Sequence, residues 1–94
     1  MISVSDHALD RVRDRRLIEP YLVSRQAVIQ LWRAGMLERW LDPDDPPGSC
    51  TLTSCSEVGV LVGRLYLPNR RVVVISALTL QQYENNKRMR WRAP

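Results

Sequence analysis

VGVLVGRLYLPNRRVVVISAL, residues 58–78, is the stretch that decides the fold of this chain. Two runs rich in apolar and β-branched residues, Val58 to Leu67 and Arg71 to Leu78, flank residues 68–70, where Pro and Asn favour a turn. Two such runs joined by a tight connection predict a β-hairpin. The run from Val72 to Ile75 is apolar at every position, which indicates a strand covered on both faces.

Outside the hairpin, the remaining strand signals are short. Residues 42–49 form a loop, because no regular structure tolerates this density of Pro, Gly and Asp, and the loop is expected to separate a helical half from a β half. Residues 51–53 follow it as a short strand, and residues 1–4 are β-prone at the start of the chain. Behind the hairpin, Thr79 and Gln82 have the spacing of a capping box, which predicts a short helix over residues 80–86.

Two helices are predicted in the first half of the chain. The first runs from Asp6 to Ile18 and ends before Pro20, since the residue preceding a proline is pushed out of the helical region. Ser24 caps the second, which reaches Ala34 and ends at Gly35. Its apolar residues gather on one broad face, the pattern of a helix packed on a sheet. We therefore expect an α+β fold in which two N-terminal helices pack on a small antiparallel sheet of three or four strands.

Length and composition limit the classes of protein. With 94 residues, 45% hydrophobic and 26% charged, the chain is expected to form a single globular domain, 1–94, with a flexible basic tail at residues 87–94. The formal net charge is +4, which favours a nucleic acid or an acidic protein as partner. No apolar run approaches the length of a membrane span and no leader is recognisable, so we expect a cytoplasmic protein of a bacterial or phage-infected cell, with no membrane association.

The first helix carries the most informative pattern. His7, Arg11 and Arg15 are spaced four residues apart, which places them in one stripe along a helix. A neutral imidazole can accept a proton from a ribose hydroxyl, and guanidiniums can hold the phosphate, so these three are the candidate catalytic residues of a metal-free ribonuclease. The alternative interpretation is a solvated face held by ion pairs, because a parallel acidic stripe lies beside the basic one: Asp6, Asp10 and Asp14.

A second set of residues is suited to nucleic-acid binding. In the C-terminal segment an aromatic ring interleaves with cations, an arrangement that stacks an unpaired base and holds its phosphates. Basic residues in the hairpin extend this surface. The full set is Arg64, Arg70, Arg71, Lys87, Arg88, Arg90 and Trp91. The alternatives are a plain solvated tail and charges that protect a sheet edge.

Metal and cofactor chemistry receive no support. Cys50 and Cys55 lack a second ligand pair and the chain has one histidine, so no metal site is expected. Two cysteines are also too few for a disulfide scaffold, and reduced thiols are expected in a cytoplasmic protein. No Gly-rich phosphate loop, nucleophile elbow or dinucleotide fingerprint occurs, and no cofactor is predicted.

The order of features over residues 2–79 resembles small toxin-like and phage-encoded domains of the RelE/BrnT-like type and a related domain family of unknown function. The shared features are a short strand followed by His7-Ala8 with Arg11 and Arg15, then a second helix and a hairpin ending in a Val-rich strand. The resemblance implies helices on one side of an antiparallel sheet and, in the toxin members, ribonuclease activity, with Arg71 as a weaker match to the active face. The loop at 42–48 and the extension from Tyr83 onward depart from this pattern.

Three functions follow from these patterns as expectations. The first is a toxin-like RNA-binding or RNA-cleaving domain, neutralised by an acidic antitoxin. The second is a phage or mobile-element protein that inhibits a host (defence) complex by protein contact, with Trp40 and Trp91 as anchors. The third is sequence-independent nucleic-acid binding through the basic tail. RNA or another nucleic acid and an acidic protein are thus the predicted partners, and the oligomeric state is left open.

Overall fold

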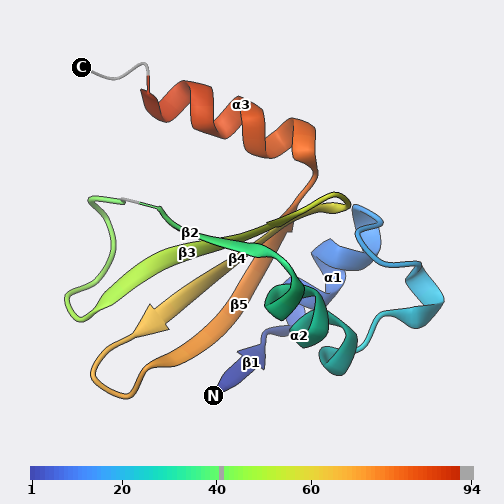
Figure 1. Cartoon of the computed structure of the whole chain (residues 1–94), viewed down its shortest axis with the longest axis horizontal. Coiled ribbons are helices and arrows are strands. Elements are labelled where there is room, and N and C mark those ends of the chain that lie inside the picture. Colours follow the sequence, from blue (N-terminus) through green and yellow to red (C-terminus); the bar gives the residue numbers. More distant parts are fainter. Residues whose placement is uncertain (41, 92–94) are drawn as a thin grey trace.

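The computed structural model describes residues 1–40 and 42–91 of the chain, the last four of them by their backbone alone (Figure 1). Helical and strand segments alternate only at the start, and most of the sheet comes from the second half. In chain order the elements are β1 (Ile2–Val4), α1 (Asp6–Asp14), the 3-10 turn η1 (Pro20–Leu22), α2 (Arg25–Ala34), β2 (Met36–Trp40), β3 (Ser49–Ser56), β4 (Gly59–Tyr66), β5 (Arg71–Leu78) and α3 (Leu80–Trp91).

The strands form one five-stranded sheet in the order β1-β5-β4-β3-β2. The α+β class is confirmed, and the predicted second strand of the hairpin has the bounds of β5. The expectation of a purely antiparallel sheet of three or four strands is wrong, because β1 pairs in parallel with β5 through Ile2 and Val72. Two helices and three strands separate β1 from β5 in the sequence, and no local pattern encodes that pairing.

Strand β2 was not predicted. It follows α2 directly, so the 42–49 loop does not divide a helical half from a β half. Met36, Leu37, Glu38 and Arg39 are all exposed, and only Trp40 is half-buried. An edge strand exposed on both faces has no period-two pattern of apolar residues, which is the signal that identifies a strand.

Both helices start where the sequence predicts, and a serine caps each of them. The Ala8 amide donates to Ser5 Oγ at 3.0 Å, and the Ala27 amide donates to Ser24 Oγ at 3.1 Å. However, α1 ends at Asp14, four residues before the predicted Ile18. Arg16 adopts a left-handed φ of 56°, and the Leu17 amide donates to the Val12 carbonyl at 3.1 Å. This is a Schellman ending with Arg in the place usually taken by Gly, so the sequence carries no stop signal there.

Helices α1 and α2 cover one face of the sheet (Figure 1). Ala8 and Val12 of α1 and Val28 and Trp32 of α2 are buried in a single apolar core with strand residues such as Leu61. The prediction that Val72–Ile75 is covered on both faces is wrong. Val74 is fully buried, but Val73 and Ile75 on the other face are only half-buried, since no helix of the N-terminal pair reaches that face.

Helix α3 starts at the predicted capping box. The Thr79 amide donates to Gln82 Oε1 at 3.0 Å, and the Gln82 amide donates to Thr79 Oγ1 at 3.1 Å. The helix continues to Trp91, beyond the predicted end at Asn86, and its ribbon turns back from the end of β5 and runs clear of the sheet in this view (Figure 1). Among the described residues, no helix is long and apolar enough to span a membrane.

Candidate nucleic-acid interface

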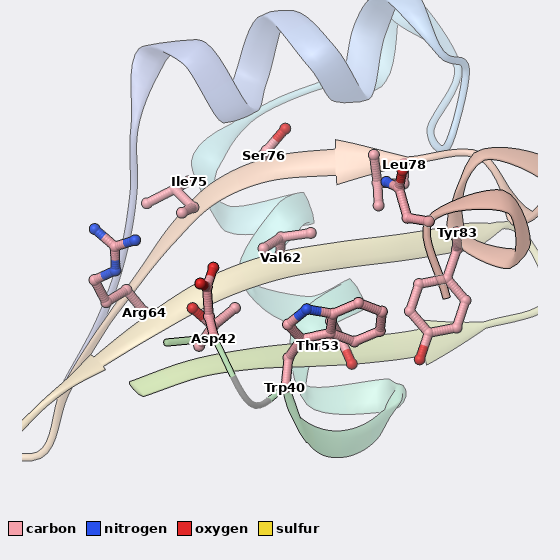
Figure 2. A pocket seen from close by; sticks show the side chains of 11 residues that line it. Trp40, Asp42, Thr53, Val62, Arg64, Ile75, Ser76, Leu78 and Tyr83 are labelled. Carbon is pink, nitrogen blue, oxygen red and sulfur yellow. The ribbon is translucent and has the colours of Figure 1, made fainter. Parts of the chain in front are cut away.

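The face of the sheet that the N-terminal helices leave open contains a cavity of about 460 Å³ (Figure 2). Side chains of four strands, of the segment after β2 and of α3 line it. They are Trp40, Asp42, Thr51, Thr53, Val62, Arg64, Ile75, Ser76, Leu78, Tyr83 and Asn86. A volume in this range is typical of pockets that hold small ligands.

Strand alternation explains why these residues share a face. Successive side chains of a strand point to opposite faces, so Val62 and Arg64 lie opposite Leu61 and Gly63, which meet the helices. A register shift interrupts the pairing of β4 and β5: Val62 pairs with Ser76, but Gly63 pairs with Val74. The extra residue is Ile75, and it lies in the cavity wall. Bulges of this kind are common next to binding sites because they re-aim side chains.

Two aromatic rings form one end of the cavity. The ring centroids of Trp40 and Tyr83 are 5.7 Å apart with planes tilted by 54°. The Tyr83 hydroxyl donates to Glu38 Oε2 at 3.0 Å, which ties α3 to the edge strand β2. Lys87 Nζ lies 5.8 Å from the centre of the Tyr83 ring. The rings therefore have a fixed geometry and a cation beside them.

The pKa of the Tyr83 hydroxyl is raised, so the hydroxyl keeps its proton to a higher pH than an ordinary tyrosine does. Burial raises the pKa of this hydroxyl well above its ordinary value, and the hydrogen bond to the Glu38 carboxylate raises the pKa further, since ionisation would place two negative charges together. A pKa raised in the folded state stabilises the fold below the unfolded-state value of about 10 and loses that contribution as the pH rises above it.

We expect this shift to appear as an alkaline loss of stability. Above about pH 10 the wild type should lose roughly 1 kcal/mol per pH unit more than Tyr83→Phe, which has no proton to release. Near pH 8 the variant should be about 1 kcal/mol less stable than the wild type, because one hydrogen bond is lost. Urea unfolding at both pH values measures this, with Tyr21→Phe as control, since Tyr21 is 83% exposed. Parallel pH profiles for wild type and Tyr83→Phe would show that Tyr83 plays no part.

Arg64 stands at the other end of the cavity from the rings (Figure 2). Its Nη2 is 3.9 Å from Asp45 Oδ1. Asp45 is itself held by Thr51, whose amide donates to Oδ2 at 3.0 Å and whose hydroxyl donates to Oδ1 at 2.8 Å. Arg64 Nε is buried and has no hydrogen-bond partner among the described residues. An unpaired buried donor costs about 1–3 kcal/mol.

A second pairing of cation and ring lies further along the same face. Tyr66 follows Arg64 by two residues on β4 and pairs with Arg71 of β5. The Arg71 guanidinium lies 5.4 Å from the centre of the Tyr66 ring. Arg70 is exposed in the preceding turn, with a left-handed φ of 52°. The open face thus carries, in line, an aromatic corner, a guanidinium and a ring with its own guanidinium.

The candidate catalytic residues lie on the covered side of the sheet, His7 and Arg11 on α1 and Arg15 at its C-cap. Arg11 Nε donates to His7 Nε2 at 3.3 Å, and Arg11 Nη1 is 4.0 Å from Asp14 Oδ2. Arg15 instead donates to the backbone carbonyl of Ala77 in β5. The structure therefore brings His7 and Arg11 together at the surface, turns Arg15 toward the sheet, and includes none of the three in the lining of the cavity.

The residues predicted to bind nucleic acid fall into two groups in the structure. Arg64, Arg71 and Lys87 lie on or beside the open face, whereas the side chains of Arg88, Arg90 and Trp91 are outside the described residues. Cys50 and Cys55 are both half-buried free thiols. No group of three or more His, Cys, Asp or Glu side chains in the described part of the chain is arranged to hold a metal ion.

The sequence did not identify two residues of the cavity as candidate nucleic-acid contacts. Trp40 was considered only as an anchor for a protein partner, and Tyr83 only as part of an extension. A signal was present for Tyr83, because it follows the capping box by one residue and so lies in the first turn of α3, next to the end of β5.

Comparison with known proteins found no matching family model, curated protein or solved structure.

Proposed function

We propose that this protein is a toxin-like RNA-binding domain that holds a single-stranded segment across the open face of its sheet. The observation that carries the proposal is the combination, in one cavity, of the Trp40–Tyr83 corner and the Arg64 guanidinium. Single-stranded nucleic acids are bound by this pair of features, since rings stack on bases and cations track the phosphates.

The charge distribution supports RNA over an uncharged ligand. The net charge is +4, and Arg64, Arg71 and Lys87 are gathered around the open face. Guanidiniums suit phosphate because their planar donors match its oxygens. An acidic protein, such as an antitoxin, would bind the same cations and so compete with RNA.

A second candidate function is inhibition of a host complex by protein contact. The observation in its favour is the start of β2, where Met36 is 77% exposed and Leu37 is 57% exposed on an edge strand. Exposed apolar side chains beside unpaired strand groups suit the addition of a partner strand. Under this function the purified protein would bind no RNA and would retain one host protein.

Titration of a labelled single-stranded RNA at several salt concentrations tests the proposal. We expect affinity to fall steeply with salt, and Arg71→Gln to weaken binding while reducing the slope by about one ion. Arg33→Gln is the matched control, since Arg33 is exposed at the end of α2 on the covered side, and its salt slope should equal that of the wild type. Equal slopes for all three proteins would refute the binding face.

The same incubations, run on a denaturing gel, separate binding from cleavage. If His7 cleaves RNA, the wild type should produce fragments and His7→Ala should leave the RNA intact, because the imidazole is the proposed proton acceptor. Intact RNA with both proteins limits the function to binding. His7→Ala should leave affinity unchanged, since His7 does not line the cavity.

A further inference from the structure

We propose that the cavity receives one unpaired base, stacked in the corner formed by Trp40 and Tyr83, while Arg64 holds the phosphate of the same nucleotide. This inference rests on the proposed function and specifies how one nucleotide is held. Figure 2 shows the two rings together at one end of the cavity and Arg64 at the other. The separation gives the nucleotide a direction, with its base at the rings and its phosphate at the guanidinium.

The ring end is suited to a flat aromatic ligand. The centroids are 5.7 Å apart and the planes are tilted by 54°, so the rings meet as a corner and are not stacked on each other. A base can therefore lie against one ring and touch the other with its edge, an arrangement that aromatic groups prefer. Val62, Ile75 and Leu78 supply an apolar floor that excludes water from the base.

The polar groups around this floor can recognise the edge of a base. Thr51, Thr53, Ser76 and Asn86 contribute hydroxyl and amide groups to the lining. The hydroxyls of Thr51 and Thr53 are buried and donate to Asp45 and to the Glu38 carbonyl, so Ser76 and Asn86 are the more accessible groups for the edge of a base. A few polar groups on an apolar wall orient a ligand without binding it by charge.

The phosphate end follows from Arg64. Its side chain is 30% exposed and sits 3.9 Å from Asp45, which holds the guanidinium at the cavity without enclosing it. Asp42 also lines the cavity on the Arg64 side (Figure 2), so a phosphate would have to compete with carboxylates for the remaining guanidinium donors, to which it can make a planar contact. Beyond Arg64, the Tyr66–Arg71 pair offers the next ring and the next guanidinium on the same face. That continuation favours a nucleotide within a strand of RNA over a free one.

The test compares adenosine monophosphate with ribose 5-phosphate, followed in two-dimensional NMR spectra of the full chain. We expect the nucleotide to bind about tenfold more tightly, the effect of one stacked base, and to shift the indole N–H signal of Trp40. Val62→Phe, which fills the floor, should remove the difference between the two probes. Val58→Phe is the matched control, because Val58 lies in an exposed turn outside the cavity and should keep the difference.

The possible outcomes of this test distinguish the base pocket from the proposed RNA-binding function. Equal affinity for the two probes overturns the base pocket, and if RNA still binds in the salt titration, the proposed function stands without it. Loss of RNA binding altogether refutes both. Adenosine monophosphate binding as tightly as RNA at low salt would overturn the assignment to a nucleotide within a strand. If Val62→Phe does not fold, Trp40→Ala serves in its place, and an undiminished preference for the nucleotide in that variant also overturns the inference.

Discussion

Replacing Trp32 with Ala is expected to lower the free energy of unfolding by about 3–5 kcal/mol. Trp32 is 3% exposed in the core between α2 and the sheet, and its backbone carbonyl accepts from Ser54 Oγ at 2.8 Å. Its ring lies so close to β4 that a Cβ at Gly63 would come within 2.6 Å of Cη2. A domain of this size has a total stability of about 5–15 kcal/mol, so the variant should be partly or largely unfolded.

Urea unfolding followed by circular dichroism measures the loss, since fluorescence changes when Trp32 is removed. A double-mutant cycle with Gly63→Ala sharpens the test. In the wild type, Gly63→Ala should cost about 1–3 kcal/mol because the new methyl group collides with the ring. In Trp32→Ala the collision is absent, and most of that cost should disappear. Additive effects, or a loss below about 1 kcal/mol for Trp32→Ala, would mean that the ring does not support the sheet.

Much of the fold was predictable because its signals are local. The caps of Ser5 and Ser24 and the capping box of Thr79 each involve residues three apart in the chain. The end of α1 was not predictable, because Arg16 takes a left-handed conformation that Gly usually adopts. The position of β1 beside β5 was not predictable either, because the paired residues Ile2 and Val72 lie far apart in the sequence.

The candidate site was predictable only in its charges. Arg64 and Arg71 stood out as basic residues in an apolar hairpin, and the structure places both on the open face. The rings could not be assigned to the same site, because Trp40 comes from an edge strand without periodicity and Tyr83 from the last helix, 43 residues later. Sequence spacing detects groups on one helix or strand, as it did for His7 and Arg11, but it does not detect groups that meet across a sheet.

Arg64→Glu is expected to weaken RNA binding by about a hundredfold, or roughly 2.7 kcal/mol. The guanidinium lies in a cavity with an apolar floor, where charge interactions are stronger than in open water. The substitution removes the cation that faces the phosphate and sets a carboxylate in its place, so attraction becomes repulsion. Removal of the charge alone, in Arg64→Gln, should cost about tenfold.

Stability must be separated from binding in this comparison, because Glu at position 64 would lie beside Asp45, 3.9 Å from the present guanidinium. Arg64→Gln removes the buried unpaired Nε donor without adding charge, but it also leaves Asp45 without its ion-pair partner, so the free energy of unfolding of this variant is measured beside its affinity. Weak binding by a fully folded Arg64→Gln would therefore report the lost phosphate contact alone. Wild-type affinity in both variants, measured by fluorescence anisotropy with single-stranded RNA, would remove Arg64 from the interface and with it the cavity as the place where RNA binds.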